Sequence, residues 1–265
     1  MPPATQGALL APPAPADDAG RWFRRQPRTA VPRVRLVCFP HAGGAASLYR
    51  EWPDGLPAGI EVLAARYPGR QDRFHEPPVE HMAELADRLT AALRPYLGAP
   101  LAFFGHSLGS DVAYEVTRRL EERFGVSPER IFVSGAAAAY ASDPVDLTGW
   151  TDAELAAEVR RLDAPHAGIL DDPELAALLL PALRADYRLN ARYRPTQAEL
   201  GTVRAPITAL TGDADPLLPP EDVLGWGALT TGGFTHRVFS GGHFYLEQHR
   251  AAVLRMVTAA LLPAG

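Results

Sequence analysis

The sequence predicts a single α/β domain in which helices flank a mostly parallel sheet. Short apolar runs of strand length alternate with longer segments whose apolar residues recur at helical spacing. A glycine-rich turn with a central serine, at residues 105–109, joins one such strand to one such helix. With 265 residues, 47% of them hydrophobic, the chain can bury the core of one full domain.

The order of the expected elements gives the domain plan. Residues 1–20 are rich in proline and alanine and are expected to be a disordered extension of a domain formed by residues 21–265. The strands are expected at residues 33–39, 60–66, 101–105, 131–135, 206–211 and 235–239. The helices are expected near residues 80–97, 108–124, 219–228 and 244–262.

An insertion without strand character interrupts this alternation at residues 142–199. Only short amphipathic segments occur there, and prolines separate them. The insertion falls between the serine turn and the later loops that carry the other candidate residues. We expect it to form a helical lid over the site; the alternative is a structural subdomain without a gating function.

Ser107 is the expected nucleophile. It is the central residue of Gly-His-Ser-Leu-Gly, between the apolar strand at 101–105 and an amphipathic helix. A sharp strand-to-helix turn needs small neighbours, here glycines, and presents the hydroxyl at the N-terminus of a helix, where backbone N–H groups favour an oxyanion. This context is typical of a nucleophile elbow. The alternative is a chance match in a chain with 23 glycines.

The elbow arrangement places an acid and then a histidine later in the chain. Asp215 follows the strand at 206–211 in Gly-Asp-Ala-Asp-Pro and is the expected acid. Asp213 is the alternative acid; otherwise it is a turn residue that bonds the nearby backbone. His243 follows Gly-Gly after the strand at 235–239. Of the eight histidines, only His243 has both the position in chain order and the loop that are expected of the general base.

Two backbone N–H groups are expected to form an oxyanion hole. One is that of Leu108, which directly follows the nucleophile. The other is that of Ala42, in the Pro-His-Ala-Gly-Gly-Ala loop after the first expected strand. Paired glycines in this loop would let the backbone pass close to a substrate carbonyl. An ordinary Gly-Gly turn is the alternative.

Five motifs together resemble the stand-alone type II thioesterases of polyketide and nonribosomal peptide synthesis. They are Phe-Pro-His-Ala-Gly-Gly at 39–44, Tyr-Pro-Gly-Arg at 67–70, the elbow at 105–109, the acid loop at 212–216 and Gly-Gly-His-Phe at 241–244. The resemblance runs from about Trp22 to the C-terminus and includes Leu-Arg-Ala-Asp-Tyr at 183–187, which resembles the end of that family's lid.

The sequence departs from the family pattern after the serine. Leu108 stands where the family often has Met, and Ser110 and Asp111 replace small apolar residues. Because the backbone N–H of Leu108 performs the expected task, this departure leaves the activity intact. Asp111 suits the helix dipole in the first turn, and it could alter the edge of the pocket.

The resemblance implies an α/β-hydrolase fold with a helical lid and a serine thioesterase that works through an acyl-enzyme. Its substrates would be acyl groups on the phosphopantetheine arm of an acyl or peptidyl carrier protein, and its role the editing of stalled or misprimed synthases. No metal or dissociable cofactor is needed. A small-molecule carboxylesterase or lipase of the same fold is the alternative function.

Arg70 and Arg73 are expected at the entrance for the carrier or substrate. With Arg66 they follow the second expected strand, and loops after parallel strands lie at the sheet edge that bears the elbow. Arginine there could pair with carboxylates or the phosphate of a carrier. The alternatives are a solvated basic loop or an Arg70 salt bridge that only holds the loop.

Composition excludes several other classes. The net charge is −5 without a basic run, so no nucleic-acid partner is expected. No stretch of 18 apolar residues and no signal-peptide pattern occur, so no membrane span is expected and the location is expected to be cytoplasmic. The one cysteine, Cys38, rules out a disulfide framework. We expect a monomer.

Overall fold

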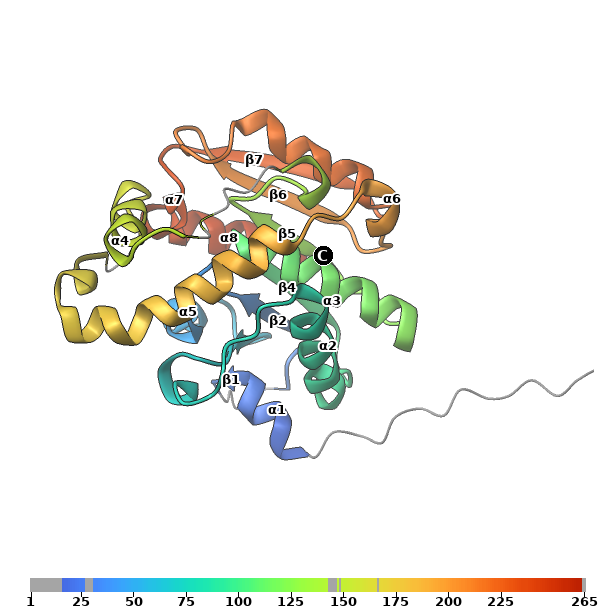
Figure 1. The fold of residues 1–265 in the computed structure, drawn as a ribbon. Coiled ribbons are helices and arrows are strands. Elements are labelled where there is room, and N and C mark those ends of the chain that lie inside the picture. Colours follow the sequence, from blue (N-terminus) through green and yellow to red (C-terminus); the bar gives the residue numbers. More distant parts are fainter. Residues whose placement is uncertain (1–15, 27–30, 143–146, 148, 166, 264–265) are drawn as a thin grey trace, which may run out of the picture.

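A seven-stranded sheet organises the protein, in the order β1-β3-β2-β4-β5-β6-β7 (Figure 1). The computed structural model describes residues 16–26, 31–142, 147, 149–165 and 167–263. Neighbouring strands run parallel except β1, which pairs antiparallel with β3 at the edge. The strands are β1 (Phe23–Arg25), β2 (Val34–Phe39), β3 (Ile60–Ala65), β4 (Leu101–His106), β5 (Ile131–Ser134), β6 (Ile207–Gly212) and β7 (Phe234–Phe239).

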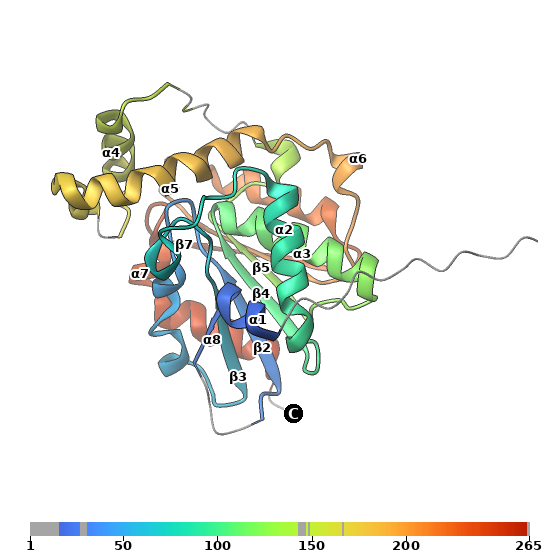
Figure 2. The same ribbon diagram turned by 60° about the horizontal axis from the view of Figure 1, so that its bottom comes forward.

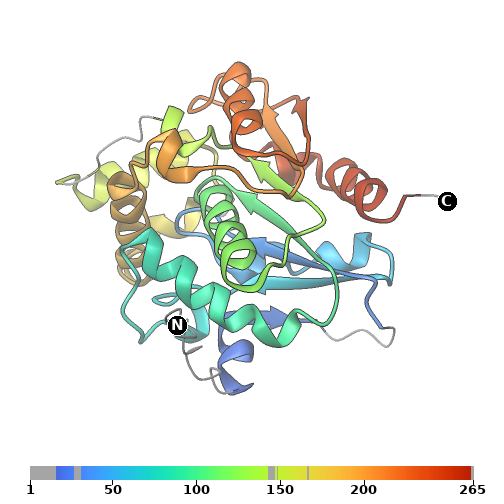
Figure 3. The same cartoon turned by 90° about the vertical axis from the view of Figure 1, so that its right-hand side faces the viewer.

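Helices cover both faces of the sheet (Figure 3). Helices α2 (Met82–Leu93) and α3 (Leu108–Phe124) lie on one face, and α8 (Arg250–Leu261) lies on the other. Successive strand residues point to opposite faces, so Phe103 joins the core beneath α2 and α3, whereas Phe104 joins the core beneath α8. The central strands are fully buried on both faces, which explains their continuous apolar sequence.

All six expected strands are present, and the α/β fold with a mostly parallel sheet is confirmed. The sequence did not predict β1, because this edge strand has only three residues. Three expected helices have a different form. Residues Arg94–Tyr96 leave the α-helix as a 3₁₀ turn that contains a proline, and Pro220–Leu229 is 3₁₀ throughout. The last expected helix divides at His249 into α7 (Tyr245–Gln248) and α8.

The structure differs from the expected disorder at the end of the N-terminal segment. Helix α1 (Ala16–Trp22) occupies part of the segment expected to be disordered, and the rest, residues 1–15, lies outside the described part of the chain. The Trp22 side chain is buried, and the Arg73 guanidinium lies 4.2 Å from the centroid of its ring. This cation–π contact fastens α1 to the domain.

The described residues between β5 and β6 form helices and loops but no named strand. The helices are α4 (Asp152–Arg161), α5 (Pro173–Arg192) and α6 (Gln197–Leu200), together with 3₁₀ turns at Ala139–Ala141 and Ala167–Asp171. A capping box starts α4 and an Asp-Pro pair starts α5, so local sequence fixes both N-termini. Figure 2 shows α4 and α5 lying together at one end of the sheet. A small separate apolar cluster joins them, which includes Leu155, Leu180 and Leu183.

Within the described ranges, no helix is both long enough and apolar enough to span a lipid bilayer.

Candidate active site

Ser107 lies in a strained turn between β4 and α3. Its backbone has φ 53° and ψ −124°, in the left-handed region that non-glycine residues rarely adopt. A side chain at Gly105 would place its Cβ 2.1 Å from the Gly109 carbonyl oxygen. A side chain at Gly109 would place its Cβ 2.0 Å from the Phe39 carbonyl oxygen. The two glycines therefore allow the close approach that forces the turn. Ser107 is partly exposed, although the residues on both sides of it are buried.

His243 and Asp215 form a buried pair. The His243 Nδ1 atom lies 2.8 Å from Asp215 Oδ2, and the other Asp215 oxygen accepts a 2.9 Å hydrogen bond from the Leu217 N–H. Asp213 instead bonds the histidine loop, because its carboxylate accepts from the Gly241 N–H at 2.9 Å. Of the two candidate acids, Asp215 thus contacts the histidine, and Asp213 supports the backbone near it.

The three residues lie in segments at one edge of the sheet. Ser107 follows β4, Asp215 follows β6 and His243 follows β7, and strands β4 to β7 are parallel neighbours whose carboxyl ends share that edge. The His243 ring centroid is 5.2 Å from that of His106, the residue directly before Ser107.

The loop at residues 41–44 follows β2 at this edge, and two of its backbone N–H groups already have acceptors. The Gly44 N–H donates to the His41 carbonyl at 2.9 Å, and the Gly43 N–H donates to Asp186 Oδ2 at 2.7 Å. The other two N–H groups of this loop, those of His41 and Ala42, have no acceptor among the described residues, and that of Ala42 stays the expected oxyanion donor. The Leu108 N–H is also available, because the first N–H groups of a helix have no intrahelical acceptor.

Two further histidines support the site, and sequence reasoning did not find their role. The His41 ring packs against Phe244 at a centroid distance of 4.9 Å and against His106 at 5.9 Å. Burial lowers the pKa of His41 to about 4 and that of His106 well below its ordinary value, so both stay neutral. Neutral neighbours do not compete with His243 for a proton near pH 7.

Ser134 extends the support beneath His106. Its Oγ lies 3.0 Å from His106 Nδ1 and 2.6 Å from the Tyr245 hydroxyl. Ser134 is fully buried, so it is out of reach of a substrate, unlike Ser107. Within the described ranges, no three His, Cys, Asp or Glu side chains are grouped to hold a metal ion.

Arg70 and Arg73 lie inside the protein. The Arg70 side chain is 5% exposed and forms a two-pronged ion pair with Asp186 at 2.6 and 2.8 Å. Arg73 is 3% exposed and pairs with Glu76 at 2.6 Å. Both charges are thus neutralised within the chain, and neither guanidinium faces outward as an entrance residue would. For Arg70 the structure matches the alternative of a salt bridge that holds the loop.

Asp111 is a buried carboxyl on the first turn of α3. Asp111 is 8% exposed, and its Oδ1 atom has no hydrogen-bond partner among the described residues. Burial, with a smaller contribution from the charge of Glu115, raises the pKa of the Asp111 carboxyl to about 8. At neutral pH it is therefore mainly protonated.

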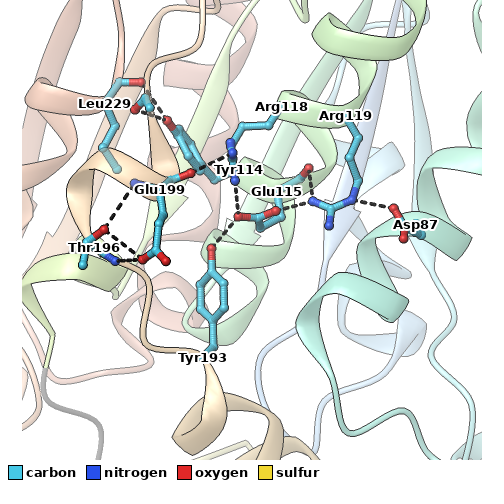
Figure 4. A network of polar contacts seen from close by, with 10 residues as sticks. Asp87, Tyr114, Glu115, Arg118, Arg119, Tyr193, Thr196, Glu199 and Leu229 are labelled. Carbon is cyan, nitrogen blue, oxygen red and sulfur yellow. Dashed lines mark hydrogen bonds and ion pairs between the residues drawn. The ribbon is translucent and has the colours of Figure 1, made fainter.

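Glu115, one turn further along α3, is fully partnered. Figure 4 shows it as the centre of a polar network that joins α3 to the chain just after α5. Its carboxylate accepts from the Tyr193 hydroxyl at 2.7 Å and from Arg118 at 2.8 Å, and it also pairs with Arg119. The C-terminal end of α5 is thereby fastened to the domain.

The Asp111→Asn variant is expected to be more stable than the wild type, and the gain should grow with pH. A folded pKa near 8 exceeds the unfolded value of about 3.9, so the folded state binds more protons between those values, and its stability falls as pH rises. Asparagine removes this loss. Thermal melts should show a small gain near pH 4.5 and a gain of at least about 1 kcal/mol near pH 8. A gain that is the same at both pH values would contradict the protonated state.

The comparisons with known proteins agree with one another. The family described as Thioesterase domain matches residues 34–261. The chain is 42% identical over 248 residues to Thioesterase PikA5 of Streptomyces venezuelae, across 92% of this chain and 87% of that protein. It is also 42% identical over 248 residues to a probable cadicidin biosynthesis thioesterase of Streptomyces griseus, across 93% of this chain and 68% of that protein.

Solved structures give the same result. The type II thioesterase BorB from the borrelidin biosynthetic cluster superposes with a TM-score of 0.82 at 40% identity, across 91% of this chain and 97% of that one. YbtT, a type II thioesterase from the yersiniabactin pathway, superposes with a TM-score of 0.82 at 27% identity, across 91% and 98% of the two chains.

Proposed function

The chain belongs to the thioesterase family and is a type II thioesterase of polyketide and nonribosomal peptide biosynthesis. From this premise, we propose which residues perform its reaction. An enzyme of this kind hydrolyses acyl thioesters on carrier proteins and so edits the assembly line. We propose Ser107 as the nucleophile, His243 as the general base and Asp215 as its partner. The buried His243–Asp215 contact, at the sheet edge that bears the strained serine, is the observation that carries this proposal.

In the first half of the reaction, Ser107 attacks the thioester carbonyl as His243 takes the hydroxyl proton. Asp215 keeps the Nδ1 atom of His243 protonated and stabilises the imidazolium that forms. The N–H groups of Ala42 and Leu108 donate to the oxyanion. The tetrahedral intermediate then collapses, the carbon–sulfur bond breaks, and His243 returns its proton to the departing thiol.

In the second half, water replaces the thiol. His243 accepts a proton from the water as its oxygen attacks the Ser107 ester, and the same oxyanion donors stabilise the second intermediate. Collapse releases the carboxylic acid and returns the proton to Ser107. Each of these groups comes from one chain, which supports our proposal that a monomer suffices for the chemistry.

We also propose that residues 142–199 act as a lid. Helix α5 supports this role, because Leu183 and Asp186 contact Gly43 in the loop that carries the Ala42 N–H. A segment in contact with this loop can limit the access of water and substrate when it moves.

Substrate preference tests the proposed function. An acyl-carrier protein, the matching acyl-N-acetylcysteamine and a p-nitrophenyl ester of the same acid should be compared at equal enzyme concentration. We expect kcat/KM for the carrier-bound thioester to exceed that for the N-acetylcysteamine thioester by at least about tenfold, because contacts remote from the carbonyl add binding energy. Preferred turnover of the p-nitrophenyl ester would instead indicate a small-molecule carboxylesterase.

A further inference from the structure

The ion pair between Arg70 and Asp186 is attached to the backbone of the loop at residues 41–44. Besides its two bonds from Arg70, the Asp186 carboxylate accepts the Gly43 N–H at 2.7 Å. Arg70 Nη1 also donates to the Gly44 carbonyl at 3.0 Å. A side chain from α5 and a side chain from the loop after β3 thus hold two consecutive residues of the loop after β2.

Packing reinforces these hydrogen bonds. Gly43 has a φ of +74°, and a Cβ there would lie 2.7 Å from Leu183 Cδ1. Leu183 and Asp186 are three residues apart, so they project from the same face of α5. The helix therefore rests directly on the loop, with an apolar contact and a hydrogen bond at the same glycine.

Stability alone does not account for this pair. The side chains of Arg70 and Asp186 are 5% and 4% exposed. Burial opposes charge on Arg70, but the charge and hydrogen bonds of Asp186 outweigh it and raise the Arg70 pKa, so the guanidinium stays charged. A buried ion pair contributes little to stability relative to apolar residues of similar volume, because both charges must be desolvated.

The pair bears on the orientation of the Ala42 N–H. This donor belongs to the peptide between His41 and Ala42, whose carbonyl accepts the Gly44 N–H at 2.9 Å. The next peptide, between Ala42 and Gly43, is held by the bond from the Gly43 N–H to Asp186. Both peptides that flank Ala42 are fixed through residues 43 and 44, which are the residues that Asp186 and Arg70 bind.

We propose that Asp186, held by Arg70, is a positioning residue that fixes the loop at residues 41–44 and so aims the Ala42 N–H at the oxyanion. The oxyanion hole is then complete only while α5 lies on the loop, and the position of α5 becomes linked to catalysis. This inference rests on the proposed function, because it assumes that Ala42 donates to the oxyanion.

Two variants on this pair and one control on the same helix test the proposal. Asp186→Asn keeps an oxygen for the Gly43 N–H but removes the charge that holds Arg70. The double variant Arg70→Met with Asp186→Leu removes both charges at similar volume, so it is expected to fold. Arg184→Ala is the control, because Arg184 lies two residues from Asp186 but pairs on the surface with Asp152 at 2.7 Å.

The readouts separate positioning from stability. They are thermal melts, kcat and KM for an acyl-N-acetylcysteamine thioester, and the inhibition constant of a matched trifluoromethyl ketone, whose serine adduct carries an oxyanion. We expect the double variant to lose about 10- to 100-fold in kcat with KM within about threefold, and to bind the ketone weaker by a similar factor. Asp186→Asn should show a smaller loss in the same direction, and Arg184→Ala should match the wild type.

A folded double variant with kcat and ketone affinity within twofold of wild type would overturn the proposal. Equal losses in Arg184→Ala would also overturn it, because the effect would then belong to α5 as a whole. If the double variant does not fold, the Asp186→Asn variant decides. Unchanged kcat and unchanged ketone affinity in Asp186→Asn would then overturn the proposal. Failure of the proposed function looks different: the ketone would not inhibit the wild type, or Ser107→Ala would keep its activity.

Discussion

The Ser107→Ala variant is expected to lower kcat by roughly 10³-fold or more and to leave the fold intact. Alanine lacks the hydroxyl that attacks the thioester, so the acyl-enzyme route is closed. The two oxyanion donors are backbone groups and remain in place, so a small residual rate above that in water is expected. The measurement is the initial rate with acyl-carrier protein at saturating concentration.

The fold of this variant is checked by its thermal melt and its circular dichroism. Serine and alanine differ by one oxygen at a partly exposed turn, and Gly105 and Gly109 still allow the close approach there. A folded variant with wild-type turnover would contradict the mechanism as a whole.

The Asp215→Asn variant is expected to lower kcat by up to about 10⁴-fold. Asp215 lies 2.8 Å from His243 Nδ1, and an asparagine amide in its place can turn its N–H₂ group toward that nitrogen. The histidine would then carry its proton on Nε2 and could not accept the proton of Ser107. The neutral amide would also fail to stabilise the imidazolium.

Asp213→Asn is the matched control, two residues away in the same loop. Asp213 accepts the Gly241 N–H at 2.9 Å, and an asparagine oxygen can accept the same bond. We expect kcat within about threefold of wild type, because this change does not reach the histidine ring. If both variants fold and Asp213→Asn loses more activity, our choice of acid is wrong by two positions.

Local sequence was sufficient for the strands and for the order of the proposed triad. The central strands are buried on both faces and therefore read as continuous apolar runs. Ser107 directly follows such a strand and Asp215 lies three residues after another, whereas His243 follows the edge strand β7, which is mostly exposed. The parallel topology brings all three to one edge. Their positions follow from local patterns and one rule of topology.

Contacts between distant segments could not be predicted in this way. Arg70 and Asp186 are 116 residues apart, and nothing near either residue indicates that the other neutralises it. The sequence therefore predicted an exposed arginine at the entrance, whereas tertiary packing buries it. The same reason hides the contact between Ser134 and Tyr245, 111 residues apart, which supports His106.

The most direct test of the account is to locate the acyl group during turnover. The wild type and Ser107→Ala should be mixed with an acyl-N-acetylcysteamine thioester, quenched in acid within the first turnover, and examined by intact-protein and peptide mass spectrometry. We predict that the wild type carries one acyl group, on the peptide that contains Ser107, and that Ser107→Ala carries none. An acyl group on another residue such as Ser134, or its retention in Ser107→Ala, would contradict the account.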